Sequence, residues 1–240
     1  MKFLGAEPID PTTSQRLVAQ AAESLGRSDW HGAVTYLESA AIVAAASTLP
    51  SILDTLASLY VTRNQHDKLA RLVVDADDLT PQLAIGALLL ERNWLLGIGD
   101  TNAPRLPLDQ VLSRLREHIG AGQYLAEELV TICSLLVVTG TVEMALQLLQ
   151  ALLEMRVQVD EELASRVLAL ALDRNRKAEA RIIIDLLAAA GDAWRVRSRR
   201  YRLLLGDPAA EPIVAGQDKV IDFMASNGHR FRSTGRSRGR

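Results

Sequence analysis

A repeat of about 35 residues is the feature that most constrains the fold of this chain. The segment TGTVEMALQLLQALLE, which begins at Thr139, recurs 35 positions later as RNRKAEARIIIDLLAA. In each copy an alanine follows a turn residue by five positions, Ala145 after Gly140 and Ala180 after Asn175. The segments before the turns carry apolar residues at i, i+3, i+4 and i+7, namely Leu129, Ile132, Cys133 and Leu136, then Ala164, Val167, Leu168 and Ala171. Such a stripe is one face of an amphipathic helix, so each copy predicts a helix, a turn and a second helix.

The same spacing occurs twice nearer the N-terminus. Ser28 precedes Ala33 by five positions, and Gln65 precedes Ala70 by five. Ala70 lies 37 residues after Ala33 and 75 residues before Ala145, which is about two periods. Between them, the segments PQLAIGALLLERNWLLG and LPLDQVLSRLREHIG supply two more helical patterns. The chain therefore predicts about five helical hairpins.

The alanine has a physical role in this pattern. A small residue early in the second helix lets the two helices of a hairpin cross at the usual axial separation of about 8 to 10 Å. One hairpin cannot cover its own apolar faces, so successive hairpins must stack. Hydrophobic residues make up 48% of the chain but aromatic residues only 4%, which favours helix packing over a β-sandwich. We expect an all-α protein, an α-solenoid of about five hairpins.

Several local signals predict where the helices begin and end. Thr12 with Gln15 fits a capping box, and Thr80 before Pro81 fits an N-cap followed by proline at the first helical position. Asp160, followed by Glu161 and Glu162, places acids at a helix N-terminus, and Gly120, Gly191 and Gly228 fit helix ends.

These signals and the composition divide the chain into six parts. We expect an N-terminal extension over 1–12, a first helical subarray over 13–97, a loop over 98–107, a second subarray with a C-terminal capping helix over 108–206, a short helical segment over 207–228, and a disordered arginine-rich tail over 229–240.

Residues 14–191 resemble the tetratricopeptide and pentatricopeptide repeat superfamily. Ala33, Tyr36 or Leu37, and Ala40 fall where a tetratricopeptide second helix has small, large and small residues, with Trp30 near the aromatic that starts it. Residues 130–160 resemble a pentatricopeptide unit. The resemblance implies either of two functions. Tetratricopeptide arrays bind peptides or protein helices in a concave groove of first helices, and pentatricopeptide arrays read RNA.

The residues at the reading position favour the first function. An RNA-reading array has a polar residue early in the first helix, where this chain has Cys133 and Leu168, and only Asp160 keeps the closing polar residue. Side chains without good donors or acceptors cannot read base edges. We expect a non-enzymatic scaffold, adaptor or chaperone that binds a protein partner, and bacterial secretion chaperones and assembly adaptors resemble this design.

Aromatic residues are the candidate contacts to a protein partner, because buried aromatic anchors dominate interfaces. The candidates are Trp30, Tyr60, Trp94, Trp194 and Tyr201. At helical spacing the same residues also suit a hydrophobic core. In the stretch WRVRSRRYRLLL, a helix would place Trp194, Ser198, Tyr201 and Leu205 on one face and arginines on another.

Charge separates the body of the chain from its end. Residues 1–191 carry 16 Lys+Arg and 24 Asp+Glu, a net charge of −8, whereas residues 192–240 carry 11 and 5, a net charge of +6. The alternative function is therefore a nucleic-acid-associated protein that makes phosphate contacts through its basic end. Its candidate residues are Arg195, Arg199, Arg202, Arg230, Arg232, Arg236, Arg238 and Arg240. A solvated cap and a solubilising or acid-binding tail are the other interpretations.

The remaining chemistry predicts no catalytic, metal or cofactor site. Cys133, the single cysteine, lies on an apolar stripe and fits a buried thiol in a reducing compartment. The four histidines lack zinc spacing, and Asp75, Asp77 and Asp78 lack the glycine and glutamate of a calcium loop. No apolar run approaches the roughly 20 residues of a spanning helix, and the N-terminus lacks a signal-peptide core. We expect a cytoplasmic protein without membrane insertion.

Overall fold

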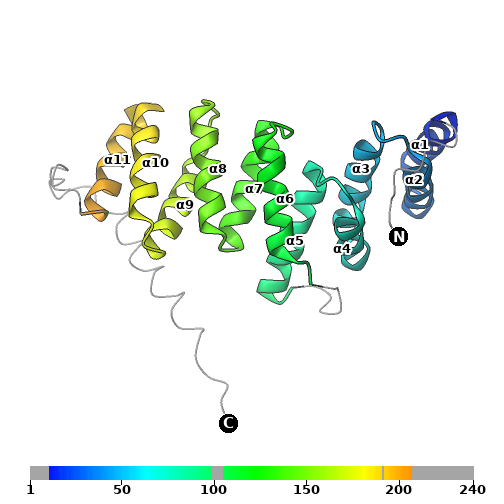
Figure 1. Cartoon of the computed structure of the whole chain (residues 1–240), viewed down its shortest axis with the longest axis horizontal. Coiled ribbons are helices and arrows are strands. Elements are labelled where there is room, and N and C mark those ends of the chain that lie inside the picture. The colour runs from blue at the N-terminus through cyan, green and yellow to red at the C-terminus, as the bar shows by residue number, and fades with distance from the viewer. Residues whose placement is uncertain (1–10, 99–104, 191, 207–240) are drawn as a thin grey trace, which may run out of the picture.

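The computed structural model describes residues 11–98, 105–190 and 192–206, and across these residues it contains eleven α-helices and no strand (Figure 1). The helices are α1 (Pro11–Gly26), α2 (Trp30–Val43), α3 (Leu49–Thr62), α4 (His66–Asp75), α5 (Pro81–Leu96), α6 (Leu108–Gly120), α7 (Ala126–Val138), α8 (Val142–Glu154), α9 (Glu161–Asp173), α10 (Lys177–Ala190) and α11 (Asp192–Leu204). The prediction of an all-α protein is confirmed. The predicted segment 207–228 and the predicted tail lie outside the described residues.

The helices follow one another in chain order along the long axis of the molecule. Figure 1 shows α1 and α2 at one end and α10 and α11 at the other. Each substantial contact between helices joins neighbours or next-nearest neighbours in the chain, so α7 packs on α5, α8 and α9. The apolar core accordingly runs through the whole row instead of filling one centre.

Four of the turns between paired helices share one geometry. Ser28, Asn64, Gly140 and Asn175 each have a left-handed backbone, with φ between 53° and 74°, and each stands two residues before the next helix begins. The N–H of each donates to the carbonyl three residues earlier, and the next N–H donates to the carbonyl five residues earlier. These bonds satisfy carbonyl groups that the end of a helix would otherwise leave without partners.

The second of these turns differs by one residue from the sequence prediction. The left-handed residue is Asn64, not Gln65, so Leu69 instead of Ala70 occupies the position of Ala145. Leu69 fits there because it faces Gly86 of α5, where an added Cβ would lie 3.0 Å from the Leu69 Cδ1 atom. The space for a larger side chain comes from the neighbouring helix.

The helices of a hairpin approach closely at the alanine position. Ala33, Ala145 and Ala180 have no exposed surface. The Sγ atom of Cys133 in α7 lies 3.6 Å from the main-chain oxygen of Ala145 in α8. Two small residues therefore meet where α7 and α8 cross, as the spacing predicts.

The helix boundaries agree with most of the local signals. Thr80 is the extended N-cap of α5 with Pro81 at its first position, and α6 ends at Gly120. The Asp160 carboxylate accepts the Leu163 N–H at 2.6 Å and caps α9. The Thr12 capping box was wrong, because α1 begins at Pro11 and includes Thr12. Gly191 and Gly228 lie outside the described residues.

Polar side chains join α6 and the segment that follows it to the end of α4 and the loop between α4 and α5. The Arg114 guanidinium donates to the main-chain oxygens of Val73, Ala76 and Asp77 at 2.8 to 3.2 Å. The hydroxyl of Tyr124 donates to the Leu79 oxygen at 2.6 Å. These bonds fasten the middle of the row, where α6 makes few contacts with α5.

Candidate protein-interaction surface

A groove lies between α7 and α9, the first helices of two adjacent hairpins. Its volume is about 340 Å³, and it is open to solvent along one side. We call it the α7–α9 groove. Its lining residues are Val130, Thr131, Ser134 and Leu135 of α7, and Asp160, Glu162, Leu163 and Arg166 at the start of α9.

The groove combines an apolar floor with polar edges. Leu135 and Leu163 are buried, whereas Thr131, Glu162 and Arg166 are exposed. Glu162 and Arg166, one turn apart on α9, form an ion pair at 3.8 Å. The Thr131 hydroxyl donates to the Glu127 main-chain oxygen at 3.0 Å and is therefore held against its own helix. A few polar groups around an apolar floor are typical of a binding site.

The local sequence explains why the groove forms here. The small polar residues Thr131 and Ser134 occupy the side of α7 that faces α9. Larger side chains at these two positions would fill the space. Sequence reasoning missed these residues, although their spacing of three positions beside the apolar stripe was a signal that could have found them.

The five aromatic candidates lie outside this groove, and one of them is unavailable to a partner. Tyr60 is 3% exposed, and its hydroxyl donates to the Glu38 carboxylate at 2.7 Å. Burial, together with this bond, raises the pKa of Tyr60. Tyr60 therefore packs in the core, which leaves little of its ring for contact with a partner.

Trp30 and Trp94 lie beneath arginine side chains. The Arg63 guanidinium carbon is 4.1 Å from the Trp30 ring centre, and that of Arg105 is 3.8 Å from the ring centre of Trp94. Arg105 also pairs with the buried Glu91 carboxylate at 3.5 Å. Trp94 remains 48% exposed, so part of its ring is open to a partner.

The end of α5 carries further exposed apolar residues. Leu95, Leu96 and Ile98 are about half exposed beside Trp94. This patch is separate from the α7–α9 groove, and nothing in the described part of the chain covers it.

Trp194 and Tyr201 face inward from α11, as the helical spacing predicts. The Ser198 hydroxyl between them donates to the main-chain oxygen of Ile184 in α10 at 3.2 Å. The Tyr201 hydroxyl is 2.7 Å from the hydroxyl of Ser165 in α9. Both aromatic rings are half-buried and hold α11 against its neighbours, which limits their use by a partner.

The arginine candidates divide into two groups. Arg195 and Arg199 are exposed on α11, and Arg202 pairs with Asp185 of α10. The candidates Arg230, Arg232, Arg236, Arg238 and Arg240 lie outside the described residues.

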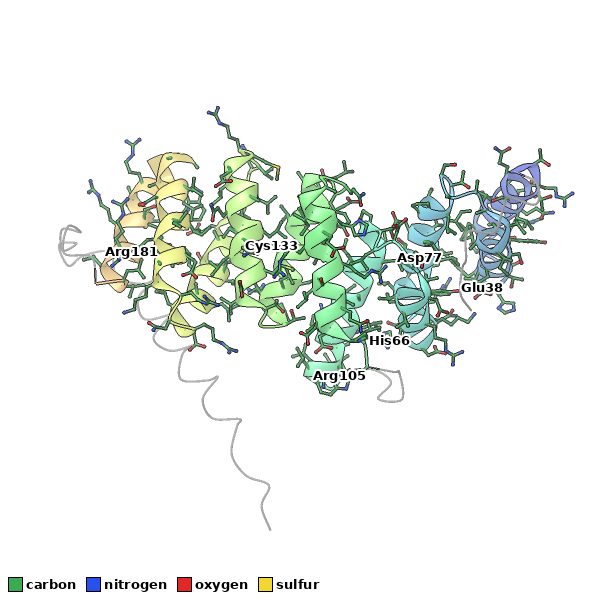
Figure 2. All side chains as sticks on the ribbon, in the orientation of Figure 1. Glu38, His66, Asp77, Arg105, Cys133 and Arg181 are labelled. Atoms are coloured by element: carbon green, nitrogen blue, oxygen red, sulfur yellow. The ribbon has the colours of Figure 1, made fainter. Side chains whose placement is uncertain are left out.

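Within the described ranges, no group of three or more His, Cys, Asp or Glu side chains could hold a metal ion. Cys133 lies in the interior between α7 and α8 (Figure 2). Burial raises the pKa of its thiol to about 12, so the thiolate that nucleophilic chemistry requires is scarce at neutral pH. Among the described helices, none combines the length and the apolar content that crossing a bilayer requires.

No family model, curated protein or solved structure matches this chain. The geometry of the described residues is therefore the basis for a functional proposal.

Proposed function

We propose that this chain is an α-solenoid of tetratricopeptide-like hairpins that holds a segment of a protein partner in the α7–α9 groove. It would act as a non-enzymatic scaffold, adaptor or chaperone, of the kind that serves bacterial secretion or assembly systems. The observation that carries this proposal is a groove between two first helices, with an apolar floor and polar edges. That is the surface on which stacked hairpins present a binding site.

The lining suits a short segment with one or two apolar anchors. Leu135 and Leu163 offer apolar contact below, and Ser134 and Arg166 offer hydrogen bonds at the edge. A groove of about 340 Å³ holds a few side chains, so further contacts along the row of helices would add affinity. The exposed Trp94 patch at the end of α5 is an additional apolar surface on a first helix.

The substitution Thr131→Arg tests this proposal. Thr131 is exposed, so an arginine there extends into the groove without disturbing the core. We expect proteins that co-purify with the chain from its native host to be lost, or their affinity to fall at least about tenfold, a change of roughly 1.4 kcal/mol. Quantitative mass spectrometry of affinity-purified samples, followed by titration with the recovered partner, measures this.

Thr35→Arg is the matched control. Thr35 is exposed on α2, a second helix far from the groove, and the chemical change is identical. Partners retained by the control and lost by Thr131→Arg support the groove as the binding site. Partners retained equally by both variants would contradict it.

The exposed arginines of α11 favour a second candidate, a protein associated with nucleic acid through its basic end. This candidate predicts binding of single-stranded RNA or DNA that weakens steeply with salt and is lost when residues 229–240 are removed. Binding that does not depend on salt concentration, or that is retained after the truncation, would count against this candidate.

A further inference from the structure

The chain leaves α11 by the same turn that ends the first helix of four hairpins. Gly206 has φ of 71°, stands two residues after the end of α11, and donates its N–H to the Leu203 oxygen at 2.9 Å. Gly140 stands in the same relation to α7 and bonds to Val137 in the same way. Equivalent turns also end α6 and α8, which are second helices. The turn alone therefore does not show whether α11 is a first or a second helix, and the positions of its side chains must decide this.

The helices can be compared position by position, counting back from the left-handed residue of each turn. Seven positions before it, the four matching first helices have Ala21, Ala57, Cys133 and Leu168, each exposed by 1% or less. Cys133 shows the direction of this position, because it meets Ala145 of the second helix of its own hairpin. In α11 the same position is Arg199, which is exposed.

The flanking positions repeat this difference. Four residues before the turn residue, the other helices bury Ser24, Tyr60, Leu136 and Ala171. In α11 that residue is Arg202, which is half-buried and pairs with Asp185 of α10. Three residues before it, they have Leu25, Val61, Val137 and Leu172, all packed partly against the core. In α11 that residue is Leu203, which is 36% exposed, and Leu204 beside it is 56% exposed. The side of α11 that would face a second helix is thus basic with exposed apolar residues.

The chain beyond Gly206 has the complementary pattern. Residues 207–222 contain Asp207, Glu211, Asp218 and Asp222 against the single Lys219. Pro212 can open a helix but not continue one, so a helix in this stretch would have residue 212 as its first position.

From Pro212, a helix would have one acidic and one apolar side. At 100° per residue, Asp218 and Asp222 share one face, four positions apart. The apolar residues Ile213, Val214, Val220, Ile221 and Met224 gather beside them. Residues 212–224 would make a helix of 13 residues, the length of α6 to α9 and of α11.

We propose that residues 212–224 form a twelfth helix that packs on α11 and completes a sixth hairpin. Its apolar side covers Leu203 and Leu204, and Asp218 and Asp222 lie against the arginine side of α11 that includes Arg199. A segment of the same chain, and not a separate anionic ligand, would thus cover this side of α11. If the chain also has the alternative function proposed above, the arginines of residues 229–240 would then be the ones that bind nucleic acid.

Two truncations of the full chain test this inference by amide hydrogen exchange. One ends at Met224 and keeps the proposed helix, and the other ends at Gly206 and lacks it. We expect amides of α11 to exchange at the same rate in the full chain and in the chain ending at Met224. In the chain ending at Gly206 we expect their exchange to be at least about fivefold faster, with α7 to α9 unchanged. Equal α11 protection in both truncations would overturn the proposal.

Charge variants in the full chain test the pairing itself. Arg199→Glu should lower the protection of amides 212–224 about fivefold, since one attraction becomes a repulsion. The pair Asp218→Lys and Asp222→Lys should do the same, and combining all three changes should restore most of the protection. Arg181→Glu, an exposed charge reversal on α10, is the control that should leave protection unchanged. Residues 212–224 unprotected in the wild-type chain, or protected regardless of Arg199, would contradict the proposal.

Discussion

Single residues decide how the units of this chain are joined, and Asp54 is the clearest case. This side chain belongs to α3 but accepts the N–H of Gln82 at 3.0 Å, in the first turn of α5. The N-cap residue Thr80 makes no capping bond with its own hydroxyl. The cap of α5 is therefore supplied by the preceding unit. The pKa of Asp54 is raised above its ordinary value, mainly because the carboxyl is partly buried. The hydrogen bonds to Asp54 lower its pKa but do not offset the effect of burial.

This shift predicts the effect of Asp54→Asn. A carboxyl whose pKa is higher in the folded state costs stability where it must be charged, above the folded pKa, and the cost disappears as pH falls below the unfolded value. Asparagine keeps the accepting oxygen without the charge. We expect the variant to be more stable at pH 7 by on the order of 0.5 kcal/mol, because Asp54 is only half-buried and solvent screens the penalty.

Urea unfolding across pH measures this difference. The gap between variant and wild type should narrow toward pH 4 and close below it. A variant less stable than wild type at pH 7 would show that the charge strengthens the cap more than burial weakens it.

The residues that fasten the middle of the row show what sequence reasoning could not reach. The sequence predicts that Arg114 is an ordinary exposed residue of an amphipathic helix. In the structure it binds three main-chain oxygens about 40 residues away in sequence. Its partners are carbonyl groups, which every residue carries, so no sequence pattern identifies them. The bond of Tyr60 could not be predicted for a related reason, since its partner Glu38 comes from a different hairpin.

At the scale of elements, periodicity predicts the helices well and the surfaces between them poorly. The turns at Gly140 and Asn175 and the start of α9 at Asp160 follow directly from local signals. The shift from Gln65 to Asn64 arose because both residues are polar and only the backbone shows which one is left-handed. The α7–α9 groove depends on how two helices 35 residues apart lie beside each other, which their separate patterns do not specify.

The crossing of α7 and α8 makes a prediction at this scale. Ala145→Leu adds three carbon atoms beside Cys133, where neither residue has exposed surface. We expect it to lower the free energy of unfolding by about 1 to 3 kcal/mol, because overpacking forces the helices apart.

Ala178→Leu is the matched control, because Ala178 is exposed in the first turn of α10. We expect it to change stability by less than about 0.5 kcal/mol. Chemical denaturation of both variants measures the contrast. If Ala145→Leu left the free energy of unfolding unchanged, the hairpin would not need a small residue at its crossing.

At the scale of the whole molecule, every substantial contact among the described helices joins near neighbours in the chain. In the α-solenoid that we propose, each hairpin would be stabilised by the one before it and the one after it. Stacking of this kind would also place a groove between first helices, since successive units would repeat the same face along one side. The proposed function and the proposed twelfth helix both depend on this ordered row.

Small-angle X-ray scattering of the chain ending at Gly206 tests that row most directly. A compact domain of this length would have a radius of gyration of about 17 Å and a symmetric distribution of interatomic distances. We predict a clearly larger radius and an asymmetric distribution with a long tail, as expected for hairpins stacked in chain order. A radius near 17 Å with a symmetric distribution would contradict the row of hairpins, and with it the groove that we propose as the binding site.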